Sequence, residues 1–234
     1  MQSKGRASRW HAPCRVSWVR GATPWKARYT YGVNDGKLIA FEGVDGCGKS
    51  TQLRMLAERL RARGLDVVET KEPTDGVHGR RIRAMARSGR ALDPEEELRW
   101  FVEDRRDHVA RLIEPALAKG RVVLTDRYFV SSVAYQGARG LDAETILADS
   151  EREFPIPDLV IVVDVTPEEG LARVDARGDE AEPVFEEIEL QREVARQLAR
   201  IERPYLVVVD GRGTPDEVHA RVVATCEKLF DAGP

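Results

Sequence analysis

The stretch that most constrains this chain is GVDGCGKS, residues 43–50, which lies between a short apolar run and a helical pattern. It matches the spacing G-x-x-x-x-G-K-[ST], in which a glycine-rich turn after a strand directs its backbone N–H groups at phosphate oxygens. The helix that follows adds the positive end of its dipole at the same point. We therefore expect a site for a nucleoside triphosphate, formed by Gly43, Val44, Asp45, Gly46, Cys47, Gly48, Lys49, Ser50 and Thr51.

Two side chains of this turn have expected chemical roles. Lys49 is expected to reach the β- and γ-phosphates as a catalytic residue, and the Ser50 hydroxyl is expected to ligate the accompanying Mg²⁺. Cys47 is interpreted as a small side chain that the turn requires, with a reactive thiol as the alternative. The turn indicates a nucleoside triphosphate such as ATP, but not what is done with it.

Short apolar runs rich in β-branched residues alternate with helical patterns through the rest of the chain. The strand patterns cover 38–42, 66–70, 122–125, 159–163 and 206–209, and the helical patterns cover 49–63, 79–87, 94–119, 130–136, 143–153, 167–175, 184–202 and 215–230. Such strands are typical of a sheet that is covered on both faces. The alternation predicts an α/β fold of three α/β/α layers around a five-stranded parallel sheet with right-handed crossovers.

The first 36 residues differ from the rest in charge. They hold seven Lys and Arg and one acid, a net +6, while the whole chain carries −3, so residues 37–234 carry −9. We interpret residues 1–36 as a basic extension that is disordered or reflects a mis-assigned start, and residues 37–234 as one domain. A basic arm that binds nucleic acid or an anionic surface and an organelle transit peptide are the alternatives. Because the domain is acidic, we expect no nucleic-acid partner.

Composition also bears on the compartment. The chain has no run of 18 apolar residues, so no membrane span is expected. Its three cysteines are an odd number without paired metal spacing, which fits a reducing compartment better than a disulfide scaffold. We therefore expect a cytoplasmic protein.

A second group of polar residues follows the predicted strand 122–125. The stretch VVLTDRY places Asp126 and Arg127 directly after it. Ligands of open α/β sheets bind beyond the carboxyl ends of the strands, so both residues are expected to face the phosphate turn. Asp126 would orient Mg²⁺ through water and Arg127 would hold a phosphate; a surface ion pair is the alternative. The next stretch, SSVAYQGARG (131–140), is expected to form a wall of an acceptor pocket.

Phe101 and Arg105 lie four residues apart in WFVEDRRDHV, on a long predicted helix. This spacing places them on one helix face. An aromatic ring beside a guanidinium suits a nucleobase, which stacks on the ring and accepts hydrogen bonds at a carbonyl edge. Spacing alone leaves a second interpretation open, in which Phe101 belongs to the core and Arg105 faces solvent.

Taken in order, FEGVDGCGKSTQ, KEPT, FVEDRRDHV, DRY and SSVAYQG resemble the bacterial thymidylate kinase family, and the match runs from about residue 37 to 230. The phosphate turn is common to many families, whereas the later stretches are far more specific. The resemblance implies that ATP and Mg²⁺ convert dTMP to dTDP, a step in dTTP supply for DNA replication. It also implies a homodimer packed through helices, with dTMP and ATP as the small-molecule partners, and a short helical lid.

The resemblance assigns four residues to the base and sugar of dTMP. Phe101 resembles the ring that stacks on thymine, which reverses the core interpretation given above. Arg105 resembles the arginine that binds thymine O4. Tyr135 and Gln136 resemble residues at the sugar and base.

Three further residues are assigned to the sugar and acceptor phosphate. Asp45 resembles the acid that contacts the 3′-hydroxyl, and Arg127 resembles the arginine at the acceptor phosphate. Lys71, in TKEPT, occupies a position where the family more often has arginine. Lysine keeps the charge but lacks the bidentate fork, so we expect a weaker phosphate contact there.

The lid departs from the family pattern. In-line phosphoryl transfer needs positive charge around the moving group, and the family places an arginine in the phosphate turn or in the lid. This turn has none between Gly43 and Gly48, and the expected lid, residues 173–187, has only Arg173 and Arg177 beside six acids. We expect Arg177 to be the catalytic lid arginine and Arg173 to be secondary.

Two alternatives to a dTMP kinase follow from these residues. One is another kinase of nucleotides or deoxynucleosides, since such folds share the phosphate turn. The other is a non-catalytic nucleotide-binding relative with a degenerate lid, which would bind dTMP and ATP without releasing ADP.

Overall fold

The computed structural model describes residues 36–178 and 182–230, without the side chains of Arg177 and Lys228. The predicted basic extension lies outside the described residues except for Gly36, and so does part of the predicted lid. The strands are β1 (Lys37–Glu42), β2 (Val67–Lys71), β3 (Val122–Asp126), β4 (Leu159–Asp164) and β5 (Leu206–Asp210). The helices are α1 (Lys49–Ala62), α2 (Val77–Arg87), α3 (Pro94–His108), the π-helix η2 (Val109–Ile113), α4 (Glu114–Leu117), α5 (Phe129–Ala138), α6 (Ala143–Glu153), α7 (Pro167–Arg177), α8 (Ile188–Arg200) and α9 (Pro215–Phe230).

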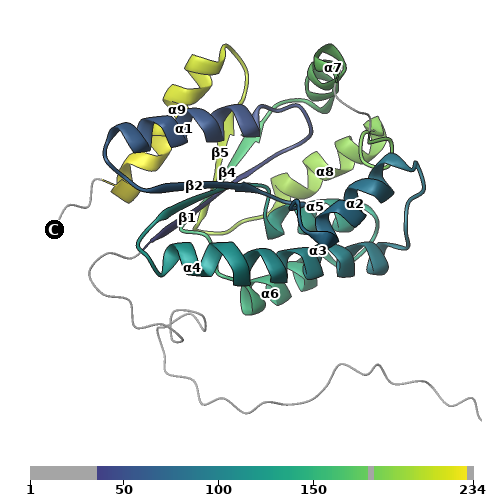
Figure 1. Cartoon of the computed structure of the whole chain (residues 1–234). Coiled ribbons are helices and arrows are strands. Elements are labelled where there is room, and N and C mark those ends of the chain that lie inside the picture. The colour runs from purple at the N-terminus through teal and green to yellow at the C-terminus, as the bar shows by residue number, and fades with distance from the viewer. Residues whose placement is uncertain (1–35, 179–181, 231–234) are drawn as a thin grey trace, which may run out of the picture. The chain divides into compact units, whose positions relative to one another are not determined.

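The strands form one parallel five-stranded sheet in the order β2-β3-β1-β4-β5, which confirms the predicted architecture. Helices α1 and α9 cover one face, and α3, α4, α5, α6 and α8 form the layer on the other (Figure 1). The central strand β1 is buried along almost its whole length, as the apolar run LIAF predicts. β1 and β3 are neighbours, so the segments after Glu42 and Asp126 meet at one edge of the sheet.

Local sequence explains where several helices begin. The Asp93 carboxylate caps α3 by accepting from the backbone N–H groups of Glu95 and Glu96, with Pro94 at the first helical position. The Thr166 and Glu169 side chains cap α7 reciprocally. No described helix is long and apolar enough to cross a bilayer.

Two predicted helices differ in the structure. The pattern over 94–119 gives α3, η2 and α4 in succession, because a π turn follows His108. The prediction that a helix begins at 184 was wrong: α8 begins at Ile188. Val184 and Phe185 are instead buried in the segment that leads into α8. Their burial against the core replaces the helical turn that periodicity alone predicts.

Candidate functional site

The glycine-rich turn joins β1 to α1 and packs closely against α7. A Cβ atom on Gly46 would lie 1.9 Å from the carbonyl oxygen of Gly170 in α7, so only glycine allows this approach. Gly48, the N-cap of α1, has φ +105, and nothing lies within 4 Å of where its Cβ would be. The turn is therefore fixed on one side and open on the other, where phosphate oxygens would approach the α1 N-terminus.

Lys49 lies folded into this turn. Its ammonium donates to the carbonyl oxygens of Gly43 at 3.1 Å and Val44 at 2.8 Å, and its side chain is buried. Both carbonyl oxygens are weak, uncharged acceptors, and they hold the Lys49 ammonium against the first residues of the turn. We expect anionic phosphate to replace them, since charge-assisted bonds are stronger.

Ser50 and Asp126, the two residues predicted at the metal, lie in contact. The Ser50 hydroxyl donates to the Asp126 carboxylate. The structure brings together a hydroxyl oxygen from α1 and a carboxylate oxygen from β3, and both are oxygen ligands of the kind that Mg²⁺ binds. No cluster of three or more His, Cys, Asp or Glu suited to a metal occurs among the described residues, so the remaining oxygens would come from phosphates and water.

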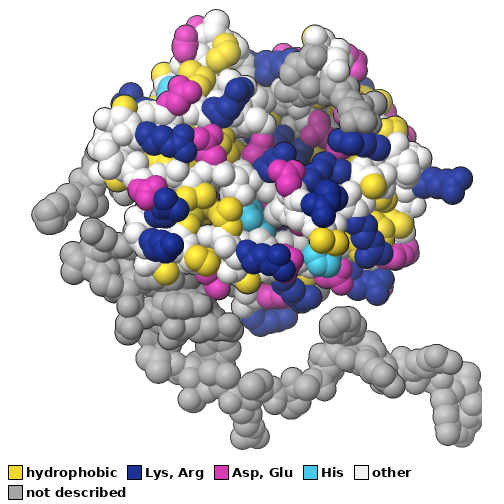
Figure 2. Space-filling view, in the orientation of Figure 1, with side chains coloured by type: hydrophobic (Ala, Val, Ile, Leu, Met, Phe, Trp, Pro, Cys, Tyr) yellow, Lys and Arg dark blue, Asp and Glu magenta, His cyan; other side chains and the backbone are white. Residues whose placement is uncertain are grey.

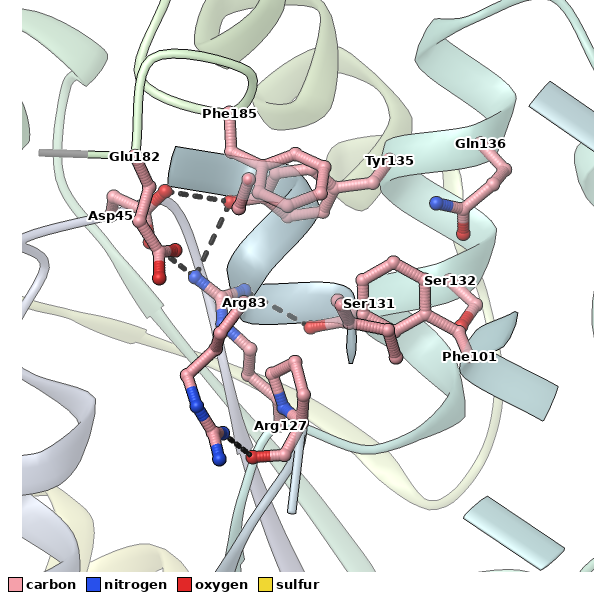
Figure 3. Close-up of a pocket in the computed structure, with 13 residues that line it drawn as sticks. Asp45, Arg83, Phe101, Arg127, Ser131, Ser132, Tyr135, Gln136, Glu182 and Phe185 are labelled. Carbon is pink, nitrogen blue, oxygen red and sulfur yellow. Dashed lines mark hydrogen bonds and ion pairs between the residues drawn. The ribbon is translucent and has the colours of Figure 1, made fainter. Parts of the chain in front are cut away.

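Arg127 links the acceptor side to the phosphate turn. Its backbone has φ 70, an unusual value for a residue other than glycine and one that is found preferentially at functional sites. The guanidinium pairs with Asp45 and donates to Ser131 Oγ at 3.1 Å and Tyr135 Oη at 3.3 Å, as the dashed lines of Figure 3 show. Burial alone would raise the pKa of Asp45, but the charges of Arg127 and Lys49 bring it below its usual value.

Gln191, which the sequence analysis did not single out, connects this cluster to the lid. Its Nε2 donates to Asp45 Oδ2 at 2.8 Å, Tyr135 Oη at 3.1 Å and the Phe185 carbonyl at 2.8 Å, and its Oε1 accepts from the Asp45 N–H at 3.1 Å. Gln191 begins an i, i+3, i+7 row of buried residues on α8 that continues with the apolar Val194 and Leu198. A polar residue in an otherwise apolar row is the sequence signal that could have identified Gln191.

Glu42 is a buried carboxylate behind Arg127. It accepts from the backbone N–H groups of Tyr128 at 2.8 Å and Ser131 at 3.2 Å, and from the Ser131 hydroxyl. Burial raises its pKa from 4.5 to about 7, although the hydrogen bond from Ser131 and the charge of Arg127 oppose the shift. Its charge therefore changes within the physiological range of pH.

Replacing Glu42 by Gln is expected to remove a pH-dependent contribution to stability. The folded carboxyl has the higher pKa, about 7 against 4.5, so this contribution is full below the unfolded value and lost as pH rises through the folded one. Between about pH 5 and pH 8, the free energy of unfolding of the parent should fall by about 2.5 kcal/mol relative to Glu42→Gln. Urea unfolding of both proteins across this range measures the difference. A difference that stays constant with pH would contradict the assignment.

A cavity opens beside these residues, between α2, α3, α5 and the segment before α8. Its empty space, including open solvent at its mouth, is about 490 Å³. In Figure 2, Lys and Arg side chains (dark blue) gather at a hollow in the visible face. The lining residues are Asp45, Pro73, Ile82, Arg83, Ala86, Phe101, Arg127, Ser131, Ser132, Tyr135, Gln136, Glu182 and Phe185.

Three aromatic rings border the cavity. Phe185 meets Phe101 edge-on at 6.1 Å between ring centroids and Tyr135 at 5.7 Å. Phe101 and Tyr135 lie on α3 and α5, and Phe185 lies in the segment leading into α8 (Figure 3). A flat apolar ring system placed between Phe101 and the opposite wall would be shielded from water.

Buried polar groups of α3 and α5 lie next to the cavity lining. The Arg105 guanidinium, 1% exposed, donates to Glu72 Oε2 at 2.8 Å and Ser132 Oγ at 3.0 Å. Glu72 is held in turn by His108 at 2.9 Å. Arg105 Nη1 and Gln136 Oε1 are both buried without a hydrogen-bond partner in the part of the chain that the structure describes. Arg105 is therefore not a solvated residue. Of the two unused atoms, the Gln136 acceptor belongs to a residue that lines the cavity, and the Arg105 donor belongs to a residue next to the lining residue Ser132.

Lys71 and Arg83 are two basic residues near the acceptor side, and only Arg83 lines the cavity. Lys71, a predicted phosphate ligand, is 58% exposed and pairs with Asp75 at 3.6 Å, away from the cavity wall. Arg83 of α2 lines the cavity and donates to the Pro73 and Thr74 carbonyls, each at 2.7 Å. Arg83 was missed because it is one of several arginines in GRRIRAMAR and nothing in that pattern distinguishes it.

The two lid arginines lie on α7. Arg173 Nη1 lies 3.5 Å from the carbonyl oxygen of Cys47, so this arginine contacts the phosphate turn directly. Arg177 is the last residue of α7, and its side chain is outside the described part of the chain. Glu182, which follows the undescribed residues, lines the cavity; burial, Asp45 and Glu186 raise the pKa of its carboxyl.

Comparison with known proteins identifies this arrangement. The family model of thymidylate kinase matches residues 41–222. The chain belongs to the thymidylate kinase family. The match covers the phosphate turn, the Asp126-Arg127 pair, the cavity and the lid, so the elements of the site described above fall within the family's own domain.

Individual thymidylate kinases match over nearly their whole length. The thymidylate kinase of Desulfotalea psychrophila is 41% identical over 198 residues, 84% of this chain and 97% of that protein. That of Akkermansia muciniphila is 43% identical over 191 residues, 82% and 91% of the two chains. That of Xanthomonas campestris pv. campestris is 45% identical over 202 residues, 85% and 88%.

Proposed function

We propose that this chain phosphorylates dTMP to dTDP with ATP and Mg²⁺, a step that supplies dTTP for DNA replication. The observation that carries the proposal is an unused pair beside the cavity: the Oε1 acceptor of Gln136, which lines it, and the Nη1 donor of Arg105, which contacts the lining residue Ser132. Thymine presents the complementary pair, an O4 acceptor beside an N3–H donor, whereas cytosine presents the reverse. The names of the related thymidylate kinases support the same substrate.

The acceptor nucleotide would lie between the aromatic rings and the Arg127 cluster. Its base stacks on Phe101, and its sugar lies beside Asp45 and Tyr135. Its phosphate takes over the Arg127 guanidinium, which now pairs with Asp45 and contacts Ser131. Arg83, at the cavity wall, supplies a second positive charge on the phosphate side.

The donor nucleotide would place its phosphates in the turn of residues 43–51. Lys49 leaves the two carbonyls it now contacts and binds the β- and γ-phosphates. An oxygen of the dTMP phosphate then attacks the γ-phosphorus, and the bond from that phosphorus to the β–γ bridging oxygen breaks. The products are dTDP and ADP. The residues hold the two nucleotides in line and offset the charge of the moving group.

Ser50 and Asp126 are the residues that would hold Mg²⁺, Asp126 through water. Their contact across α1 and β3 fits an oxygen-ligated ion. When bound, the ion neutralises charge on the phosphate oxygens of ATP.

We propose further that the protein is cytoplasmic and forms a homodimer, as the family resemblance implies. Light scattering coupled to size-exclusion chromatography measures the mass in solution directly. A mass near twice the 26.2 kDa of one chain is the expected result. A monomer that remains active would contradict the proposed homodimer.

The substrate is tested by ADP release with ATP and Mg²⁺ in parallel reactions with dTMP, dUMP, CMP, AMP, dGMP and thymidine. We expect dTMP to give the highest kcat/KM. dUMP should follow, because it shares O4 and N3–H and lacks only a methyl group, a difference of about 10- to 200-fold at most. Preference for a purine nucleotide or for thymidine would indicate another nucleotide or nucleoside kinase. Tight dTMP binding without ADP would indicate a non-catalytic relative.

A further inference from the structure

Glu97 is a buried carboxylate that has no assigned role in the proposed phosphoryl transfer. It lies on α3, one turn before Phe101, and its side chain is fully buried. It accepts from Gln136 Nε2 at 2.9 Å through one oxygen and from Arg139 Nη1 at 2.9 Å through the other. Both partners lie on or next to α5, so Glu97 ties α3 to the cavity wall.

The contact with Glu97 determines which way the Gln136 amide faces. An amide carries a donor at one end and an acceptor at the other, and an ionised carboxylate can only accept. Nε2 must therefore point at Glu97, which leaves Oε1 as the end without a partner among the described residues. In the view of Figure 3 the Gln136 amide nitrogen (blue) lies on the side of Tyr135 and its oxygen (red) points toward Ser132 and Phe101.

Arg139 holds the other oxygen of the same carboxylate. Its Nη2 also donates to the Val184 carbonyl at 3.3 Å, and its guanidinium lies 6.0 Å from the Phe185 ring. A guanidinium is donor-only, so it demands an acceptor from whatever residue stands at position 97. Arg139 thereby connects Glu97 to the segment that closes the cavity before α8.

We propose that Glu97 is a positioning residue for base specificity: it fixes the Gln136 amide with Oε1 toward the base and so selects a ring with N3–H, thymine or uracil, over cytosine. The inference rests on the proposed function, since it concerns how the same site chooses its substrate. Neither Glu97 nor Arg139 lines the cavity, so both act through Gln136.

The substitution Glu97→Gln tests this arrangement through hydrogen-bond polarity. The new amide must turn its oxygen to Arg139, because Arg139 can only donate, and its NH₂ group then faces Gln136. Gln136 has to reverse, presenting its own NH₂ to the base. That group opposes the N3–H of thymine but suits the N3 acceptor of cytosine. The size of the side chain is unchanged, so packing is preserved.

The measurement is kcat/KM for dTMP and for dCMP at saturating ATP, together with the dissociation constants of both nucleotides by calorimetry without ATP. Glu97→Gln should lower the dTMP-to-dCMP ratio by about 10- to 100-fold, the scale of a mispaired buried polar group. The KM for ATP should change by less than about twofold. Adding Arg139→Met to Glu97→Gln frees the amide at position 97 and should recover most of the ratio.

Glu95→Gln is the matched control, because Glu95 is an exposed carboxylate in the first turn of the same helix and should leave the ratio unchanged. If Glu97→Gln does not fold, Glu97→Ala replaces it, since removing the carboxylate also frees the Gln136 amide and should lower the ratio. The inference would be overturned if the parent enzyme prefers dTMP but the variants lose activity on dTMP and dCMP equally. That outcome would leave the proposed function intact. A parent that does not bind dTMP would overturn the proposed function itself.

Discussion

Arg177→Ala is expected to lower the turnover number about 10³-fold while dTMP still binds, the scale of loss when a comparable arginine is removed from a phosphoryl-transfer site. The phosphate turn supplies Lys49 but no arginine, so an arginine at the moving phosphoryl group must come from elsewhere. Arg177 ends α7, the helix whose Gly170 packs on that turn. Single-turnover kinetics with saturating ATP and dTMP measures the effect on transfer, and calorimetry measures dTMP binding.

Arg173→Ala is the matched comparison, because Arg173 lies on the same helix and already contacts the Cys47 carbonyl at 3.5 Å. We expect a smaller loss there, expressed mainly in the KM for ATP, since that contact supports the loop that binds the donor phosphates. A turnover of Arg177→Ala within about twofold of the parent, against the arginine scale cited above, would show that the assignment is wrong. A large loss confined to Arg173→Ala would transfer the role to Arg173.

Arg105→Lys is expected to reduce kcat/KM for dTMP about 100-fold, with little change in the KM for ATP. Lysine keeps a positive charge beside Glu72, which spares the fold an unpaired buried carboxylate. It cannot reproduce the planar fork that places Nη1 toward thymine O4 while the other nitrogens bind Glu72 and Ser132. Steady-state kinetics with dTMP varied, and then with ATP varied, separates the two effects.

Thermal unfolding of Arg105→Lys with and without dTMP accompanies these kinetics. The melting temperature without ligand should stay near that of the parent, and the rise on adding dTMP should shrink. If kcat/KM for dTMP is unaffected while stability falls, Arg105 supports the fold through Glu72 and does not recognise the base.

The sheet and most helices could be predicted because local patterns determine them. Apolar β-branched runs such as 159–163 have one stable environment, a sheet covered on both faces. The helix start at Pro94 follows from its Asp93 cap. What failed was the start of α8. Val184 and Phe185 match a helical pattern, but contacts with residues remote in sequence decide their conformation, since Phe185 packs on Phe101 and Tyr135.

The candidate site was predictable where residue types repeat a known spacing and not where a contact is made only in three dimensions. The spacing of the phosphate turn and the Asp126-Arg127 pair pointed to groups that the structure brings into contact, Ser50 with Asp126 and Asp45 with Arg127. Gln191 contacts Asp45 from 146 residues away, and Glu97 contacts Gln136 from 39. No periodicity in one segment reports such pairs, because their partners lie on other elements.

Phosphoryl transfer between the two nucleotides is the central activity proposed for this chain. ³¹P NMR of a mixture of ATP, dTMP and Mg²⁺ follows every phosphorus atom at once, and the parent enzyme should form ADP and dTDP in equal amounts with no inorganic phosphate. ADP accompanied by inorganic phosphate, or dTMP that binds and stays unchanged, would contradict a site in which Arg127 and Lys49 hold the two nucleotide phosphates in line for transfer.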